Sequence, residues 1–404
     1  MNRGLLRVIR ISVTLPAAIL FLFFMRVMRP VLLIRVGSLK SDRIGHFVLE
    51  TDLMLLEQQA GVSTMRQRTL DIFYAPKPIA NAFVYRMWKR KLRILPSWCL
   101  ITVYRINSLL PDGKVYQVPS ATSTCLDVHN LIDRFPANLS LTKKEYFKGI
   151  ETLEKMGLRE GDRFVCMIAR DGAYLRRSFP GRDFSYHDYR NCEIDDYRLG
   201  AESLANRGLY VFRMGSVVEK PLVSSNPRVI DYASSEYRSD FMDIFIGARC
   251  EFCVSDGLGF YAIPAAFRRP NAYVNYSPFF MFYSSRACDL GIAKTLTDRA
   301  TGKRLSLSEM KLRRVAGLSK TQDFENAGVL VTSNSPEEIE DLMIEMLDRI
   351  EGKWQSEDGD DERQNMFWQR FHDVIGEELR LRCHGEFRAH YGAKFLRNNP
   401  DWLH

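Results

Sequence analysis

The sequence predicts an α/β protein with two Rossmann-like domains that face a cleft, preceded by an apolar helix at the N-terminus. Its 404 residues exceed one ordinary hydrophobic core, so two domains of roughly 150 to 200 residues are expected. Short apolar runs alternate with helical patterns along most of the chain, which is typical of a mostly parallel sheet covered by helices. A turn-rich stretch at 110–142 separates two such successions and predicts the domain boundary.

The first succession predicts a domain over 31–140, after an N-terminal segment at 1–30. Its strands are short, continuous apolar runs, and its helices place apolar residues on one face. We expect strands at 31–36, 71–74 and 92–95, and helices at 48–59 and 80–91. A further short apolar run at 99–104 precedes a less regular region.

The second succession predicts a domain over 141–352 and a helical tail over 353–404 that could cross back to the first domain. A helix begins after Ser335, because Pro336 suits the first helical position and Glu338 completes a capping box. We expect strands at 163–169, 209–214, 227–232, 250–254, 271–276 and 329–332, and helices at 141–156, 197–206, 240–248, 336–350 and after the turn at 255–259.

The charge and cysteine content narrow the classes of partner. The net charge is +8, which fits a phosphorylated substrate, an anionic membrane surface or nucleic acid. No nucleic-acid-binding motif accompanies it, so no nucleic acid partner is expected.

The eight cysteines suit a reducing, cytosolic compartment. Cys250 and Cys253 have a zinc-like spacing but lie in a predicted strand, without a second pair, so no metal site is expected there.

The most apolar run, 11–25, has arginines on both sides. It is shorter than the about 20 residues that span a bilayer, and no small-residue cleavage site follows it. We expect a helix that lies on the inner face of a cytoplasmic membrane, with the rest of the protein in the cytoplasm. A helix docked on the protein's own surface is the alternative.

Small residues stand where a buried strand gives way to a helix: Ser255, Asp256, Gly257 and Gly259. Such a junction presents backbone N–H groups and the positive end of a helix dipole, which favours phosphate binding. In an open α/β sheet this turn lies at the carboxyl end of a strand, where ligands bind. A tight βα turn that merely needs small residues is the other interpretation.

Polar residues that follow neighbouring predicted strands are further candidates for binding a ligand. Arginine can hold phosphate through two hydrogen bonds, and carboxylates can hold sugar hydroxyls. Asp240 begins a helix, where a capping role is the plainest. Asn275 and Tyr276 could touch a base or ribose. The long loop and the next strand end supply Arg170, Asp171, Tyr174, His187, Asp188, Arg190, Arg213 and Gly215.

His46 is the candidate catalytic base. It follows the first strand in Arg43-Ile-Gly-His46, and an unperturbed imidazole has a pKa of about 6.5, suited to taking a proton from a hydroxyl. Glu50 or Asp52 could orient the ring or replace it as the base. A packing or capping histidine is the alternative.

Several blocks together resemble a group of bacterial putative glycosyltransferases associated with surface-polysaccharide gene clusters, and the resemblance runs from about residue 31 to the end. The blocks are Arg43-Ile-Gly-His-Phe-Val-Leu-Glu50, Met167-Ile-Ala-Arg-Asp171, Tyr186-His-Asp-Tyr-Arg-Asn191, Tyr210-Val-Phe-Arg-Met-Gly215, Arg238-Ser-Asp-Phe-Met-Asp243 and Phe395-Leu-Arg-Asn-Asn-Pro400. The resemblance implies a GT-B fold and sugar transfer from a nucleotide-sugar donor to a glycan or lipid-linked acceptor, as in lipopolysaccharide or capsule synthesis. It implies no cofactor beyond that substrate and no essential metal.

By this resemblance the second domain binds the nucleotide diphosphate, and His46 faces the acceptor from the first domain. Arg170, Arg190, Arg213 and the turn at 255–259 would stabilise charge on the leaving phosphate. Two alternatives remain open: a non-catalytic sugar- or nucleotide-binding component of a polysaccharide assembly complex, and another group transferase, such as a pyruvyltransferase, on the same fold.

Overall fold

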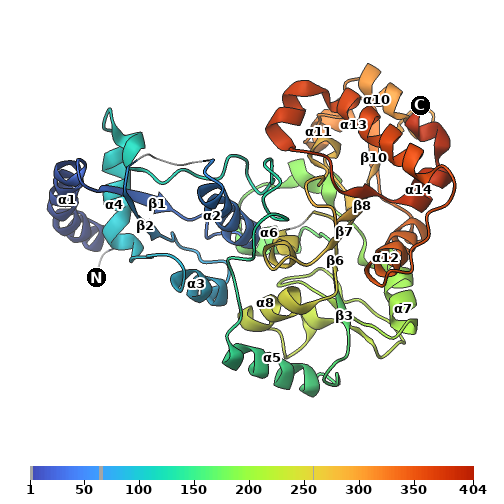
Figure 1. Ribbon diagram of the computed structural model, residues 1–404, viewed down its shortest axis with the longest axis horizontal. Coiled ribbons are helices and arrows are strands. Elements are labelled where there is room, and N and C mark those ends of the chain that lie inside the picture. The colour runs from blue at the N-terminus through green and yellow to red at the C-terminus, as the bar shows by residue number, and fades with distance from the viewer. Residues whose placement is uncertain (1–2, 63–66, 258) are drawn as a thin grey trace. The chain divides into compact units, whose positions relative to one another are not determined.

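The computed structural model describes residues 3–62, 67–257 and 259–404, with side chains described from residue 14 on. The chain divides into two compact units within the predicted turn-rich stretch (Figure 1). Unit 1 comprises Met1–Cys125 and Asn138–Ser140, and unit 2 comprises Leu126–Ala137 and Leu141–His404. The segment 126–137 therefore belongs to unit 2, although it precedes the last residues of unit 1.

Unit 1 is built around two parallel strands, β1 (Leu33–Ser38) and β2 (Thr69–Tyr74). Single parallel bridges add Gln117 beside β1 and Ile94 beside β2. Its helical elements are α1 (Arg3–Met28), the π-helical turn η1 (His46–Glu50), α2 (Thr51–Gln59), α3 (Ala82–Lys89), α4 (Ser97–Ser108) and the 3₁₀ turn η2 (Gly113–Tyr116).

The sheet of unit 1 is smaller than a Rossmann-like domain requires. The short apolar run at 99–104 adds no strand, because these residues lie inside helix α4. The buried positions of α4, Leu100, Val103 and Asn107, are three and four residues apart, which is helical spacing. The strand predicted at 92–95 is reduced to the bridge at Ile94.

Helix α1 extends beyond the predicted apolar run at both ends. Ala18, Leu22 and Met25 are buried in the core of unit 1, next to β1 and α4. Among the described residues, no helix combines the length and apolarity needed to cross a membrane. The side chains of Arg3, Arg7 and Arg10, which precede the apolar run, lie outside the described residues.

Unit 2 contains a parallel sheet of seven strands, in the order β11-β8-β7-β6-β3-β4-β5. This confirms the predicted α/β class with a large parallel sheet. Val165, Val211 and Val254, on three central strands, are fully buried, as expected for a sheet covered on both faces. The strands are β3 (Phe164–Ile168), β4 (Tyr210–Arg213), β5 (Val229–Ile230), β6 (Cys253–Ser255), β7 (Asn271–Tyr276), β8 (Leu290–Ala293) and β11 (His390–Tyr391).

Helices lie on both sides of this sheet, with α8 on one side and α7 and α12 on the other (Figure 1). The α-helices of unit 2 are α5 (Lys143–Lys155), α6 (Ala173–Ser178), α7 (Arg198–Asn206), α8 (Asp240–Arg249), α9 (Ala262–Ala266), α10 (Leu307–Leu312), α11 (Thr321–Asn326), α12 (Pro336–Ile350), α13 (Asp360–Cys383) and α14 (Ala393–Asn398). The 3₁₀ turns are η3 (Ser185–Arg190), η4 (Ile194–Tyr197), η5 (Tyr232–Ser234), η6 (Gly259–Tyr261), η7 (Phe279–Met281) and η8 (Pro400–Leu403).

Two late segments differ from the expected arrangement. The strand predicted at 329–332 forms as β10 (Val329–Thr332), but it pairs antiparallel with β9 (Thr295–Asp298) outside the main sheet. The tail at 353–404 is part of unit 2, where β11 pairs with β8 at the edge of the sheet. Periodicity cannot distinguish these outcomes, because it does not specify a strand's partner.

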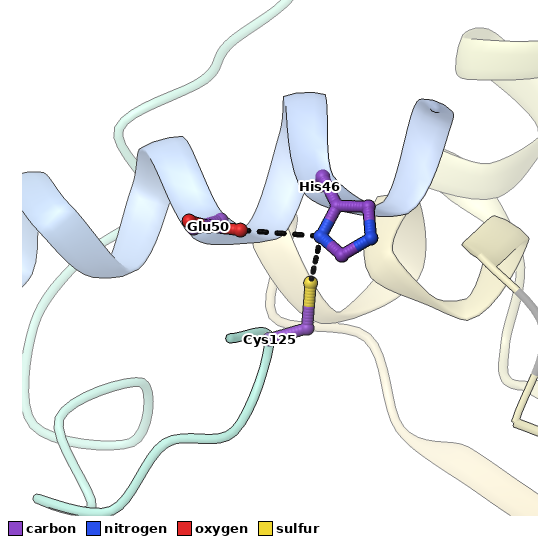
Figure 2. Close-up of side chains that lie close together, drawn as sticks. All are labelled: His46, Glu50 and Cys125. Carbon is purple, nitrogen blue, oxygen red and sulfur yellow. Dashed lines mark hydrogen bonds and ion pairs between the residues drawn. The ribbon is translucent and has the colours of Figure 1, made fainter. Parts of the chain in front are cut away.

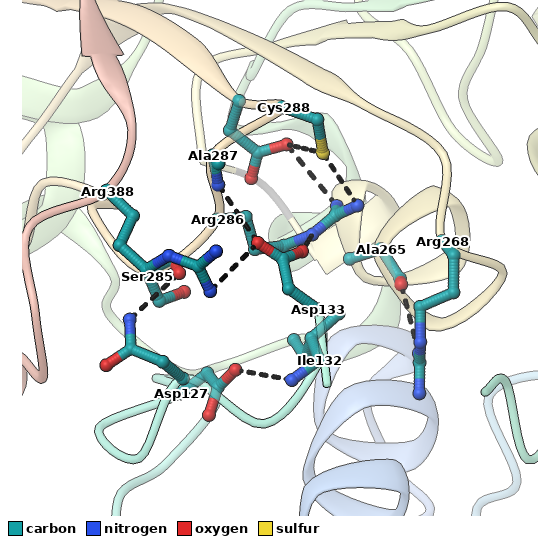
Figure 3. A network of polar contacts seen from close by, with 12 residues as sticks. Asp127, Ile132, Asp133, Ala265, Arg268, Ser285, Arg286, Ala287, Cys288 and Arg388 are labelled. Atoms are coloured by element: carbon teal, nitrogen blue, oxygen red, sulfur yellow. Dashed lines mark hydrogen bonds and ion pairs between the residues drawn. The ribbon is translucent and has the colours of Figure 1, made fainter. Parts of the chain in front are cut away.

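Asp133 fastens the segment 126–137 to the rest of unit 2 (Figure 3). Its carboxylate accepts hydrogen bonds from Arg286 Nε at 3.3 Å and from the backbone N–H of Ala287 at 3.0 Å. Arg388 adds an ion pair at 3.4 Å. The segment that leaves unit 1 is therefore held by charge as well as by packing.

Arg286 is only 2% exposed and also lies 3.3 Å from the buried carboxylate of Asp289. Its Nη1 donates to the carbonyl of Arg269 at 2.8 Å. Burial raises the pKa of Asp289 to about 6, and the charge of Arg286 acts in the opposite direction. One buried cation thus compensates two carboxylates, Asp133 and Asp289.

We expect Arg286→Met to lower the free energy of unfolding by about 3–5 kcal/mol, because removing one partner leaves buried carboxylates without their counter-charge. Urea denaturation followed by circular dichroism measures this change. The control is Arg207→Met, since Arg207 pairs with Asp348 at 45% exposure; it should cost less than about 1 kcal/mol. Equal effects of the two substitutions would contradict the role given to Arg286.

Candidate functional site

The strand order of unit 2 reverses between β3 and β6: β4 and β5 follow β3 on one side, and β6, β7 and β8 follow on the other. This is the Rossmann order, and ligands of such sheets bind outside the carboxyl ends of the strands at the reversal. The predicted turn at 255–259 begins at the end of β6, and the predicted loop at 170–191 begins just after β3. Both therefore start at this switch point.

Asp256 ties the two strand ends together. Its Oδ2 accepts the backbone N–H of Arg170 at 2.7 Å. Burial raises the pKa of Asp256, and this hydrogen bond together with the positive charge of Arg170 lowers it in part. The carboxylate uses the backbone of Arg170, so the guanidinium of Arg170 remains available for other partners; its Nε donates to Asn191 Oδ1 at 3.3 Å.

Arg170 and Arg190 bring two positive charges to the switch point. Arg190 Nη2 donates to the carbonyl of Gly257 at 3.2 Å, and Arg190 Nε is buried without a hydrogen-bond partner among the described residues. Burial lowers the pKa of Arg170, and the like charge of Arg190 lowers it further. An anion beside both groups would relieve this repulsion.

The turn after β6 can accommodate little besides glycine at its centre. Gly257 has a left-handed φ of 80°, and a Cβ there would lie 2.8 Å from the ring of Tyr276. Ser255 is fully buried, and its Oγ has no hydrogen-bond partner among the described residues. Gly259 begins the 3₁₀ turn η6, and Leu258 lies outside the described residues.

Lys294 positions the loop that carries Arg190. Its Nζ donates to the carbonyls of Tyr189 at 3.2 Å and Asn191 at 2.6 Å. Lys294 directly follows β8 and is 5% exposed. The sequence signal for this role is a lysine at the end of a buried apolar strand.

Other predicted residues have structural partners. Asp171 accepts the backbone N–H groups of Ala173 at 3.0 Å and Glu219 at 2.9 Å, so it organises the start of α6. Arg213 ends β4 at 1% exposure and forms an ion pair with Asp231 at 3.3 Å. Its Nη2 also donates to the carbonyl of Lys220 at 3.1 Å.

The remaining predicted residues lie on the elements around these. Tyr174 is half-buried on α6, and Gly215 follows β4. The ring of His187, in η3, lies 4.0 Å from that of Tyr186. Asp240 is the first residue of α8, directly after its cap Ser239.

Of the residues expected near a base or ribose, Asn275 is buried. It exchanges two hydrogen bonds of 2.6 Å with Asn334. Tyr276 instead lies against Gly257, as described above.

Unit 1 brings together His46, Glu50 and Cys125 (Figure 2). His46 Nδ1 lies 3.1 Å from Glu50 Oε2 and 3.4 Å from Cys125 Sγ. Lys40 Nζ contacts the other Glu50 oxygen at 2.6 Å. Burial alone would raise the pKa of Glu50, but the hydrogen bonds from His46 and Lys40 leave it below its usual value.

Cys125 is the member of this group that the sequence reasoning missed. Burial raises the pKa of its thiol to about 12, and the charge of Glu50 contributes. Because Cys125 is 79 residues from His46, no local spacing connects the two. The predicted neighbour Asp52 has a different role, since its Oδ1 accepts a hydrogen bond from Asn138 at 2.9 Å.

The side chains of this group are of types that bind metal ions. One ligand atom from each residue lies within 4.8 Å of the others.

Comparisons with known proteins return only remote likenesses. No protein-family model and no curated protein matches the chain. Among solved structures, the ADP-heptose LPS heptosyltransferase II of E. coli is similar at 12% identity and a TM-score of 0.33, over 60% of this chain and 86% of that one. A family 9 glycosyl transferase from Veillonella parvula DSM 2008 is similar at 9% identity and a TM-score of 0.34, over 61% of this chain and 82% of that one.

Proposed function

We propose that the protein is a glycosyltransferase that takes its sugar from a nucleotide-sugar donor, with the donor's diphosphate bound at the switch point of unit 2. The observation that carries this proposal is the pair of mutually repelling guanidinium groups, Arg170 and Arg190, beside a glycine turn at the carboxyl end of β6. Phosphate oxygens are commonly bound by arginine guanidinium groups, which donate two parallel hydrogen bonds, and by backbone N–H groups.

Transfer of a sugar leaves negative charge on the departing diphosphate. Groups that already point at this charge stabilise it without reorganising during the reaction. Asp256 and Lys294 supply such preorganisation, since Asp256 holds the backbone at Arg170 and Lys294 holds the loop of Arg190. The unpartnered Ser255 Oγ offers one more hydrogen-bond donor at the same strand end.

We assign deprotonation of the acceptor hydroxyl to His46. When Nδ1–H donates to the Glu50 carboxylate, Nε2 carries the lone pair that accepts a proton. Lys40 supports this tautomer, because its charge helps to keep Glu50 ionised. The assignment needs no resident metal or organic cofactor for the proton transfer.

For the acceptor, we propose a glycan or lipid-linked sugar of a bacterial surface polysaccharide, such as lipopolysaccharide or capsule. This part rests on the resemblance of the sequence blocks at His46, Arg170, Arg190 and Arg213.

We further propose that α1 lies on the inner face of the cytoplasmic membrane. Its outward side chains are large, apolar and exposed, although α1 packs on unit 1 through its other face: Leu15, Ile19, Leu20, Phe23, Phe24 and Val27. A contiguous apolar face of this kind marks an interaction site. Exposed basic residues of unit 1, Lys89, Arg90, Lys91 and Arg93, favour anionic lipid as the partner.

A matching nucleotide-sugar should raise the melting temperature by several degrees at about 100 times its Kd, since it binds only the folded state. UDP-, GDP-, CMP- and ADP-linked sugars are compared by thermal shift, with and without EDTA. Arg190→Gln should weaken binding about tenfold or more, because hydrogen bonds to charged groups are worth about 1.5–3 kcal/mol. The control is Arg182→Gln, an exposed arginine of the same loop.

Two results would count against this proposal. If a nucleotide-sugar stabilised the Arg190→Gln variant as much as the unsubstituted protein, Arg190 would not bind the donor and the proposed site would be wrong. Tight binding without turnover in the presence of acceptor extracts would favour the non-catalytic binding protein.

His46→Ala should lower kcat by about 10²–10⁴-fold, the usual contribution of a general base, and leave donor binding in unit 2 unchanged. Glu50→Gln should also lower kcat, because an amide holds the imidazole tautomer less firmly. The control is His372→Ala, because His372 forms an exposed pair with Glu377 at 2.8 Å. Full transfer activity in His46→Ala would exclude the base assignment.

The double variant Leu20→Ser/Phe23→Ser should bind anionic vesicles at least about tenfold more weakly, since each large apolar side chain contributes about 1.5–3 kcal/mol on burial. Cosedimentation with vesicles of phosphatidylcholine and phosphatidylglycerol measures the loss. The control is Leu312→Ser, an 84% exposed leucine of unit 2. Undiminished binding of the double variant would rule out α1 as the contact.

A further inference from the structure

Two contacts in unit 1 converge on a single ring nitrogen. His46 and Glu50 are four residues apart in the same helical stretch, so their side chains lie on one face, and Cys125 approaches from a distant segment (Figure 2). Both Glu50 Oε2 and Cys125 Sγ lie next to His46 Nδ1.

Without a metal ion, both contacts can be hydrogen bonds. A protonated Nδ1 donates to the Glu50 carboxylate, and the sulfur is a second, weaker acceptor. The backbone of Glu50 also hydrogen-bonds Cys125. Imidazole, carboxylate and thiolate are, in addition, the side-chain groups that bind zinc.

The spacing of these atoms also resembles that of ligands around one tetrahedral zinc ion. Bonds of about 2.3 Å to sulfur and about 2.0 Å to nitrogen or oxygen put sulfur and nitrogen about 3.5 Å apart, and nitrogen and oxygen about 3.3 Å apart. The corresponding distances here are 3.4 Å and 3.1 Å. The ligand types and these two distances thus fit a tetrahedral ion, and the ligand atoms of all three residues lie within 4.8 Å of one another.

The local backbone departs from regular structure at both contributing segments. His46–Glu50 forms a π-helical turn, a feature that is frequent at functional sites. Cys125 has a left-handed φ of 57°, which is uncommon for a residue with a Cβ. Strained backbone of this kind persists where its surroundings hold it, and it gathers at ligand-binding sites.

We propose that His46 Nδ1, Glu50 Oε2 and Cys125 Sγ bind one Zn²⁺ ion, with a fourth position open to water. Binding forms a Zn–S bond and releases the thiol proton to solvent. A thiolate ligand selects zinc or another soft ion over magnesium. Lys40 occupies the other Glu50 oxygen, so the carboxylate binds through one oxygen only.

The zinc-bound state and the His46–Glu50 pair of the proposed transferase are alternative states of the same side chains. A metal ion on Nδ1 takes the place of the proton that donates to Glu50; the neutral ring then carries its proton on Nε2, which cannot act as the base. Zinc should therefore inhibit transfer wherever His46 is the base. The binding inference does not depend on that function.

The test is a titration of the purified full-length protein with Co²⁺, which replaces Zn²⁺ and absorbs in the near ultraviolet when bound to thiolate. We expect one ion per chain with a sulfur-to-cobalt band. Displacement of Co²⁺ by Zn²⁺, in competition with a chromophoric chelator, gives the zinc affinity.

Cys125→Ser should abolish the sulfur-to-cobalt band and weaken zinc binding more than about tenfold, since even outer-shell partners are worth 10- to 100-fold. Glu50→Gln should weaken binding but keep the band, because the thiolate remains. Cys99→Ser, a partly buried thiol of α4, is the matched control and should change neither.

Retention of the band in Cys125→Ser, or binding that never reaches one ion per chain, would overturn the proposal. Circular dichroism of each variant separates loss of a ligand from loss of the fold, and His46→Gln provides a second ligand variant. The cobalt band measures metal binding independently of catalysis. A protein that shows the band but no transferase activity would therefore contradict the proposed function and support the metal site.

Discussion

The hydrogen bond from the Arg170 backbone to Asp256 holds the ends of β3 and β6 at a fixed separation. Those two strands lie where the strand order of unit 2 reverses, the place where ligands of such sheets bind. The buried carboxylate is costly unless it is hydrogen-bonded. The loops that carry Arg190 and Gly257 therefore start from a rigid base.

Two arginine environments in unit 2 show how carboxylates decide the role of a buried cation. Arg286 has Asp133 and Asp289 beside it, so its charge is compensated and it serves to hold the segment 126–137 in place. Arg170 has the like charge of Arg190 beside it, and the charge of Asp256 acts against this repulsion. The first arrangement is complete in the protein alone, whereas the second gains from an added anion.

His46, Glu50 and Cys125 in unit 1 are suited both to proton transfer and to metal binding. An imidazole whose Nδ1–H is held by a carboxylate is suited to accept protons at Nε2. The thiol of Cys125 lies beside the same nitrogen, so the three side chains together form a ligand set for a soft divalent ion. Which use prevails depends on whether a proton or a metal ion occupies Nδ1.

The sequence by itself determined the α/β class, most strands of unit 2, the helix after Ser335 and the turn at Gly257, because apolar runs, caps and glycines act through local backbone energetics. It also identified Glu50 as a residue that could orient His46, but placed His46 in a loop; the helical turn that puts both side chains on one face appears in the structure. Only the tertiary structure decided that 99–104 is helical and that β10 leaves the main sheet. It alone added Cys125 to His46 and Lys294 to the loop of Arg190. These outcomes depend on contacts between residues far apart in the chain, which no local pattern records.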